Sequence, residues 1–173
     1  MILGAVLAGG LSTRFGSDKA MAQLDGRTLL ARAVDTLGGW CDHVVIVGRE
    51  RGPAPCIPDW PNAQMGPLGG IAAALRQAQD CDYDSVLTCG VDSLDLPEDL
   101  LHRLSPAPAF LATQPVIGHW QADAAAIVEA ILHGEGRHSM KAFATAAGAR
   151  SVDLASAPAN INTPADLAAL EKY

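Results

Sequence analysis

The feature that most constrains this chain is an apolar run at residues 2–8 that gives way to a loop of glycines and cations. A short, continuous apolar run is typical of a β-strand buried on both faces. The loop combines Gly9 and Gly10 with the cations Arg14 and Lys19. Glycine has no Cβ to keep an anion away from backbone N–H groups, and the cations add positive charge. The stretch therefore predicts a triphosphate-binding loop after the first strand, with a plain tight turn as the alternative.

Two familiar phosphate-binding patterns do not fit this loop. The chain has no G-x-x-x-x-G-K-S/T sequence, which excludes a P-loop NTPase. It also has no G-x-G-x-x-G sequence, so a dinucleotide-dependent oxidoreductase is poorly supported.

Strands and helices alternate along the rest of the chain. A helix predicted over 28–37 is followed by a buried strand over 44–47, the spacing of a βαβ unit, so a mostly parallel sheet is expected. Residues 49–66 are expected to form a loop, because six prolines and glycines interrupt them. Further strands are predicted at 85–89, 110–113, about 119–120 and 151–154, and further helices start at 67, 96 (capped by Asp95), 124, 140 and 164. The expected fold is a single-domain α/β, Rossmann-like three-layer sandwich spanning residues 1–173.

The net charge limits the classes of partner that are expected, and the cysteine content indicates the cellular compartment. The formal net charge is −7, which argues against nucleic acid or an anionic membrane as a general partner. The four cysteines show no C-x-x-C spacing, so buried free thiols in a reducing compartment are expected. The apolar run at the start is too short for a signal peptide or a membrane span, which favours a cytoplasmic protein.

Polar residues follow other predicted elements at positions suited to ligands. Asp92 comes just after the strand at 85–89, where open α/β sheets bind ligands, and one carboxylate with phosphates and water suits Mg²⁺. Gly66 precedes a helix that begins at Pro67, and a helix start offers free N–H groups to an anion. Asn160 and Asn162 alternate along the chain, so both amides point the same way if the backbone is extended. A local turn is the alternative for the asparagines.

Four segments together resemble a known family. They are LAGGLSTRFGSDK at 7–19, GPLGG at 66–70, CGVD at 89–92 and NINTPADL at 160–167. In this order they are similar to the signatures of the molybdenum cofactor guanylyltransferases, which are MobA-like nucleotidyltransferases. The resemblance implies a nucleotide-diphospho-sugar transferase-like fold and transfer of GMP from GTP to molybdopterin or its molybdenum form, with release of pyrophosphate and with Mg²⁺ as cofactor.

The resemblance also implies a role for individual residues. Catalytic roles fall to Arg14, Lys19 and Asp92, with Asp92 as the metal ligand. The nucleotide-binding residues would be Leu7, Ala8, Gly9, Gly10, Lys19, Val47, Asp59 and Asp92, where Asp59 reads the base. The acceptor-binding residues would be Arg14, Gly66, Gly70, Asn160 and Asn162. Transient contact with cofactor-delivery proteins or molybdoenzyme chaperones is a further implication.

Two departures from the family pattern keep alternatives open. The family commonly has Asn near the guanine at the end of the second strand, whereas this chain reads Val47-Gly48. A molybdopterin cytidylyltransferase, or another small-molecule nucleotidyltransferase, is therefore the nearest rival, and a non-catalytic nucleotide-binding adaptor is the rival from another class. The usual His-Pro is His119-Trp120 here, and a structural or exposed histidine is favoured at that position over one with a substrate role.

Overall fold

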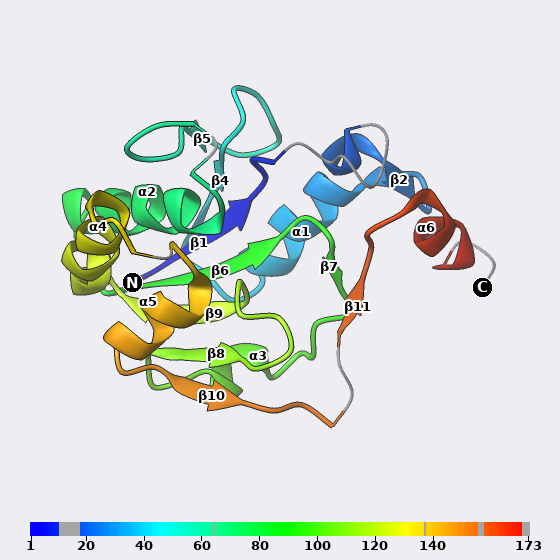
Figure 1. The fold of residues 1–173 in the computed structure, drawn as a ribbon. Helices are drawn as coiled ribbons and strands as arrows, with labels where there is room; N and C mark the ends of the chain where they lie inside the picture. Colours follow the sequence, from blue (N-terminus) through cyan, green and yellow to red (C-terminus); the bar gives the residue numbers. More distant parts are fainter. Residues whose placement is uncertain (11–17, 64, 137, 156–157, 171–173) are drawn as a thin grey trace.

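The computed structural model describes residues 1–10, 18–63, 65–136, 138–155 and 158–170 (Figure 1). Its central sheet has the strand order β10-β8-β9-β6-β1-β4-β5. These strands are β1 (Ile2–Leu7), β4 (His43–Val47), β5 (Cys56–Ile57), β6 (Ser85–Gly90), β8 (Ala109–Leu111), β9 (Gly118–Gln121) and β10 (Arg150–Val152). Only β9 runs antiparallel to its neighbours, β6 and β8, and the other pairings are parallel. The expected mostly parallel sheet is confirmed.

The remaining elements surround this sheet. The helices are α1 (Leu29–Gly38), α2 (Pro67–Asp80), α3 (Leu100–Arg103), α4 (Ala125–His133), α5 (Met140–Ala146) and α6 (Pro164–Leu170). Two short antiparallel pairs complete the fold, β2 (Gln23–Leu24) with β3 (Arg27–Thr28), and β7 (Ser93–Leu94) with β11 (Ala159–Asn160). Short 3-10 helices cover Lys19–Met21 and Ala122–Ala124. No helix of the described residues combines the length and apolar character needed to cross a bilayer.

Helices cover both faces of the sheet, because the side chains of the buried strands alternate between two apolar clusters. Val45 and Val47 of β4 pack in the cluster that contains residues of α2, α4 and α5. Ile46 packs in the other cluster, with residues of α1 and α3. Figure 1 shows α2, α4 and α5 grouped on one side of the sheet. A strand that is buried on both faces has no polar alternation, which explains its continuous apolar sequence.

The register of the central strands brings their carboxyl ends to one edge. Leu7, the last residue of β1, lies opposite Val47 of β4 and opposite Gly90 of β6. The segments that follow these three residues therefore leave the sheet side by side. This edge is the place where open α/β sheets bind ligands.

Three local expectations need correction. The loop at 49–66 contains β5, a two-residue edge strand between Pro55 and Pro58, where proline is tolerated because one side of the strand has no partner. The helix expected from residue 96 begins at Leu100 and is preceded by Asp99, whereas Asp95, the expected cap, has φ +55° directly after β7. The cysteines are free, but only Cys89 is buried, whereas Cys41 and Cys56 are half-buried and Cys81 is exposed.

The helix α6 begins with a capping box. The backbone N–H of Asp166 donates to Oγ1 of Thr163 at 3.2 Å, and the Asp166 carboxylate accepts from the N–H of Thr163 at 3.0 Å. This reciprocal pair satisfies donors that the first helical turn leaves open, and Pro164 occupies the first position of the helix. Figure 1 shows α6, in red, near β2. Leu167 and Leu170 pack there against the small cluster of Leu24, Leu29 and Ile161.

His119 is a structural residue in β9 and does not line the ligand edge. Its side chain is buried, with Nε2 2.8 Å from Oγ of Ser85 and Nδ1 3.2 Å from the carbonyl oxygen of Leu104. A carbonyl can only accept, so Nδ1 carries a proton and donates to Leu104. Burial lowers the pKa of His119, against a smaller opposing effect of the Leu104 hydrogen bond.

Acidification from about pH 7 to about pH 5 is expected to lower the free energy of unfolding through His119. Because the folded-state pKa lies below the unfolded value, the unfolded chain takes up the proton first as the pH falls. Denaturant titrations across this range should give a shallower pH dependence for His119→Asn than for the wild type. His102→Asn, at an exposed histidine of α3, is the matched control. Equal slopes for wild type and His119→Asn would contradict the assignment.

Candidate active site

Two glycines bring the ends of β1 and β4 into close contact. The N–H of Ala8 donates to the carbonyl oxygen of Val47 at 2.9 Å, which extends the pairing one residue beyond β1. Gly9 then passes Gly48 so closely that a Cβ on Gly48 would lie 2.6 Å from Cα of Gly9. Gly48 also has φ +92°, in the region that favours glycine. The result is an exposed backbone cradle at Gly9 and Gly10.

A cavity of about 530 Å³ opens on one side of this cradle. Asp59 forms part of its wall, together with Gly9, Gly10, Gly48, Arg49, Glu50, Cys56, Pro58 and Ala63. The Asp59 carboxylate lies against both glycines, since a Cβ on Gly9 or on Gly48 would be 3.3 Å from one of its oxygens. The volume is in the range of small-ligand sites, and a half-buried carboxylate supplies a directional acceptor.

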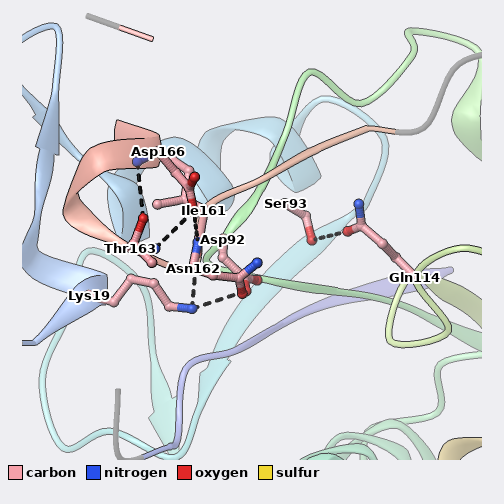
Figure 2. Close-up of polar contacts among 8 residues, drawn as sticks. All are labelled: Lys19, Asp92, Ser93, Gln114, Ile161, Asn162, Thr163 and Asp166. Atoms are coloured by element: carbon pink, nitrogen blue, oxygen red, sulfur yellow. Dashed lines mark hydrogen bonds and ion pairs between the residues drawn. The ribbon is translucent and has the colours of Figure 1, made fainter. Parts of the chain in front are cut away.

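A second cavity, of about 340 Å³, shares Gly9 and Gly10 with the first and contains the ion pair of Lys19 and Asp92. Nζ of Lys19 lies 3.1 Å from Oδ2 of Asp92, and the two side chains are 17% and 25% exposed (Figure 2). Gly90 makes room for this carboxylate, because a Cβ there would be 2.7 Å from Oδ1 of Asp92. The expected residues that follow β1 and the carboxylate that follows β6 thus meet at one cavity.

The C-terminal segment is bonded directly to this ion pair. Nζ of Lys19 also donates to the carbonyl oxygen of Ile161 at 3.1 Å, and the N–H of Ile161 donates to the carbonyl oxygen of Asp92 at 3.1 Å (Figure 2). The Ile161 side chain is fully buried. Asn160 and Asn162 flank it, with Asn160 exposed and Asn162 half-buried. Both asparagines therefore lie within two residues of the Lys19 contact, although neither lines the two cavities.

A glutamine fixes the other end of this segment. Nε2 of Gln114 donates to the carbonyl oxygen of Pro158 at 2.9 Å. Its Oε1 accepts from Oγ of Ser93 at 3.1 Å, as Figure 2 shows. Because Ser93 follows Asp92 in the chain, the segment is held at both ends against the residues that follow β6.

The predicted glycines of α2 take different positions. Gly66, with φ +73°, precedes the helix and lines the second cavity, as does Pro67. Gly70 is buried, and a Cβ there would lie 2.9 Å from Cδ2 of Leu7. Its lack of a side chain allows α2 to approach β1, and contact of Gly70 with the acceptor stays a prediction. Arg14 lies outside the described residues.

The comparison with known protein families matches residues 4–159 to the MobA-like NTP transferase domain. The chain belongs to this family. It is similar over 96% of its length to the molybdenum cofactor guanylyltransferase of Acidiphilium cryptum, with 35% identity and 92% of that protein covered. It is also similar to the molybdenum cofactor guanylyltransferase of Rhizobium johnstonii, with 32% identity, 99% of this chain and 92% of that protein covered.

Solved structures agree with the MobA-like fold. Molybdopterin-guanine dinucleotide biosynthesis protein A from Archaeoglobus fulgidus matches with a TM-score of 0.75, covering 99% of this chain and 97% of that chain. At 20% identity this similarity concerns the fold. The family resemblance predicted from the four sequence segments is confirmed, and the chain is a nucleotidyltransferase of the MobA-like family.

Arg49 and Ile161 are members of this MobA-like site that sequence reasoning missed. Arg49 lines the first cavity and forms an ion pair with Asp18, next to Lys19. Its position two residues after the end of β4 was a usable signal, because it lies at the same sheet edge as the glycine loop. Ile161 contributes only backbone groups, which its side-chain type does not reveal.

Proposed function

We propose that this protein transfers GMP from GTP to molybdopterin, or to its molybdenum form, and releases pyrophosphate. The observation that carries the proposal is the pair of adjoining cavities that share Gly9 and Gly10, with Asp59 in one and the Lys19–Asp92 pair in the other. A nucleotide that spans both would place its base beside Asp59 and its triphosphate beside Lys19. The guanylyltransferase names of the relatives support the same reaction.

Asp59 favours guanine over cytosine as the base. Guanine presents two adjacent donors, N1–H and the exocyclic amine, and a carboxylate accepts both. Cytosine presents a single exocyclic amine beside an acceptor nitrogen, so it offers the same carboxylate fewer donors. The backbone at Leu7, Ala8 and Val47 borders the cradle and completes the proposed nucleotide site.

The reaction brings together two anions, the triphosphate and the terminal phosphate of the acceptor. That phosphate is already anionic at neutral pH, so attack on the α-phosphorus needs no general base. The new P–O bond forms as the bond to the pyrophosphate oxygen breaks. The protein must hold the two anions in line and neutralise charge on the leaving group. Lys19 and Arg14 would supply positive charge for this, and the N–H groups of the cradle would donate hydrogen bonds to the phosphates.

A divalent metal fits the donor set at Asp92. The described residues contain no group of three or more His, Cys, Asp or Glu side chains able to hold a metal by themselves. Mg²⁺ bound to a nucleotide commonly takes only one or two carboxylates, with phosphate oxygens and water as the other ligands. Asp92 would be the protein ligand, and the ion would add positive charge at the phosphates.

The acceptor is proposed to bind beside the C-terminal segment. Gly66 lines the phosphate cavity, and Asn160 and Asn162 flank the Ile161 carbonyl that Lys19 contacts. Amide side chains both donate and accept, which suits the edge of a pterin.

Because Ile161 bonds to Asp92, we take residues 1–173 as one domain. Its soluble substrates suit a cytoplasmic reaction, and contact with delivery or chaperone proteins would bring and remove the acceptor.

Nucleotide competition tests the function. Purified protein with Mg²⁺ and molybdopterin should release pyrophosphate from GTP at least about tenfold faster than from CTP or ATP, the difference expected from one charged hydrogen bond. Asp59→Asn should lose most of this preference, because an amide cannot accept two donors as a carboxylate does. Asp123→Asn, at an exposed acid of the 3-10 helix Ala122–Ala124 that lines neither cavity, is the matched control. Faster release from CTP would indicate the cytidylyltransferase, and nucleotide binding without any release would indicate the adaptor.

A further inference from the structure

The ion pair between Arg49 and Asp18 joins the two cavities of the site. Nη1 of Arg49 lies 3.0 Å from Oδ1 of Asp18, and Nη2 lies 2.7 Å from Oδ2. Such a bidentate ion pair is directional as well as strong, because the planar guanidinium presents two parallel N–H donors to the two carboxylate oxygens. The Arg49 side chain is only 22% exposed. The hydrogen bond from Arg49 lowers the pKa of Asp18, so the pair stays charged at neutral pH.

Each partner of this pair is attached to a part of the site that the proposed function uses. Arg49 follows Gly48, whose N–H donates to the carbonyl oxygen of Ile57 at 2.9 Å, so its backbone is fixed to β5. Asp18 immediately precedes Lys19, and its carbonyl oxygen accepts from the N–H of Met21 at 3.1 Å. Asp18 therefore begins the 3-10 turn that carries Lys19.

Both oxygens of the Asp18 side chain bond to Arg49. This pair lowers the pKa of Asp18 more than the backbone N–H of Ala20 does. The short turn has a single buried residue, Ala20, so side-chain packing alone holds it weakly. The link from Asp18 to the end of β4 thus restrains the turn in addition to the bonds of Lys19 to Asp92 and Ile161.

We propose that Arg49 is a positioning residue which, through Asp18, fixes the amino group of Lys19 relative to the glycine cradle. The structural part of this inference concerns the nucleotide-free protein, and its effect on turnover rests on the proposed function. Loss of either partner makes the turn more mobile, so the amino group of Lys19 is less often in position to bind a triphosphate at the glycine cradle. Exchange of the two charges between positions 18 and 49 preserves the link.

The first test measures Lys19 directly, without nucleotide. Acetylation of lysines by an N-hydroxysuccinimide ester, followed by mass spectrometry, reports how accessible Nζ of Lys19 is. Arg49→Gln and Asp18→Asn should each raise the Lys19 rate about threefold or more relative to that of Lys141, an exposed lysine of α5 in the same protein. Arg103→Gln, which removes a surface ion pair with Asp99, should leave the ratio unchanged. An unchanged ratio in both site variants overturns the proposal.

The second test measures turnover with GTP and molybdopterin. Each single variant should lower kcat about tenfold with a smaller change in the KM for GTP, and the double variant Asp18→Asn/Arg49→Gln should be no worse than either. The exchanged variant Asp18→Arg/Arg49→Asp should recover a large part of kcat. If Arg49→Gln alone is impaired while Asp18→Asn is fully active, Arg49 contacts the nucleotide itself and the positioning role is wrong. A wild type without GTP-dependent turnover would overturn the proposed function, while the acetylation result still decides the positioning role.

Discussion

Replacement of Lys19 by alanine is expected to lower kcat for GTP-dependent pyrophosphate release about 100- to 1000-fold, the range for loss of one preorganised charge in a transition state. Lys19 is the cation that the described residues place in the phosphate cavity beside Asp92. Its ammonium group would meet negative charge that grows on the leaving pyrophosphate. Steady-state kinetics with saturating GTP and molybdopterin measures the effect.

Controls separate this chemical role from the structural role of Lys19. Lys141→Ala removes an exposed lysine and should leave kcat unchanged. Because Lys19 also holds the Ile161 carbonyl, thermal unfolding of Lys19→Ala must show that the fold is retained. Asp92→Ala should give a loss of similar size, since it removes the proposed magnesium ligand. Near-full activity in both Lys19→Ala and Asp92→Ala would refute the assigned roles.

Gly48→Ala is expected to damage the nucleotide site and the fold together. The added Cβ would lie 2.6 Å from Cα of Gly9 and 2.7 Å from its nitrogen, and neither backbone atom can move without shifting the cradle. The φ of +92° adds backbone strain of about 1–3 kcal/mol. We expect the Kd for GTP to rise at least about tenfold, as for a loss of about 1.4 kcal/mol of binding free energy. Calorimetry and denaturant unfolding measure the two effects.

Gly148→Ala is the matched control for this substitution. Gly148 also has a left-handed φ, +67°, but a Cβ there meets no atom within 4 Å. It should therefore lower the free energy of unfolding by about 1–2 kcal/mol without changing the Kd for GTP. If Gly48→Ala bound GTP as tightly as Gly148→Ala, the close approach of the two glycines would not matter for the site.

Local sequence patterns predicted most of the fold, because strands and helices depend on the burial pattern of successive residues and on contacts within a few residues. The continuous apolar runs at β1, β4 and β6 are what double-sided burial requires, and these strands were found nearly to the residue. The capping signals at α1, α2 and α6 also act within a few residues. The Asp25-Gly26 turn between β2 and β3 has positive φ at both residues, a conformation typical of tight hairpins.

The predictions that failed depend on contacts between distant parts of the chain. The helix α3 begins later than expected, and Asp95, its expected cap, has a left-handed φ just after β7 pairs with β11. Arg49 and Asp18 are 31 residues apart, and no periodicity relates them. Asp92 and Lys19 could be named as candidates from the sequence because each follows a recognisable local pattern.

The bonds between Lys19, Asp92 and Ile161 have a consequence for biosynthesis. A ribosome makes the glycine cradle, the lysine and both aspartates long before it reaches residue 161. A chain made only as far as β10 contains every strand of the central sheet, but it lacks the Ile161 carbonyl that accepts from Lys19. This side of the phosphate cavity can therefore be completed only after the sheet residues have been made.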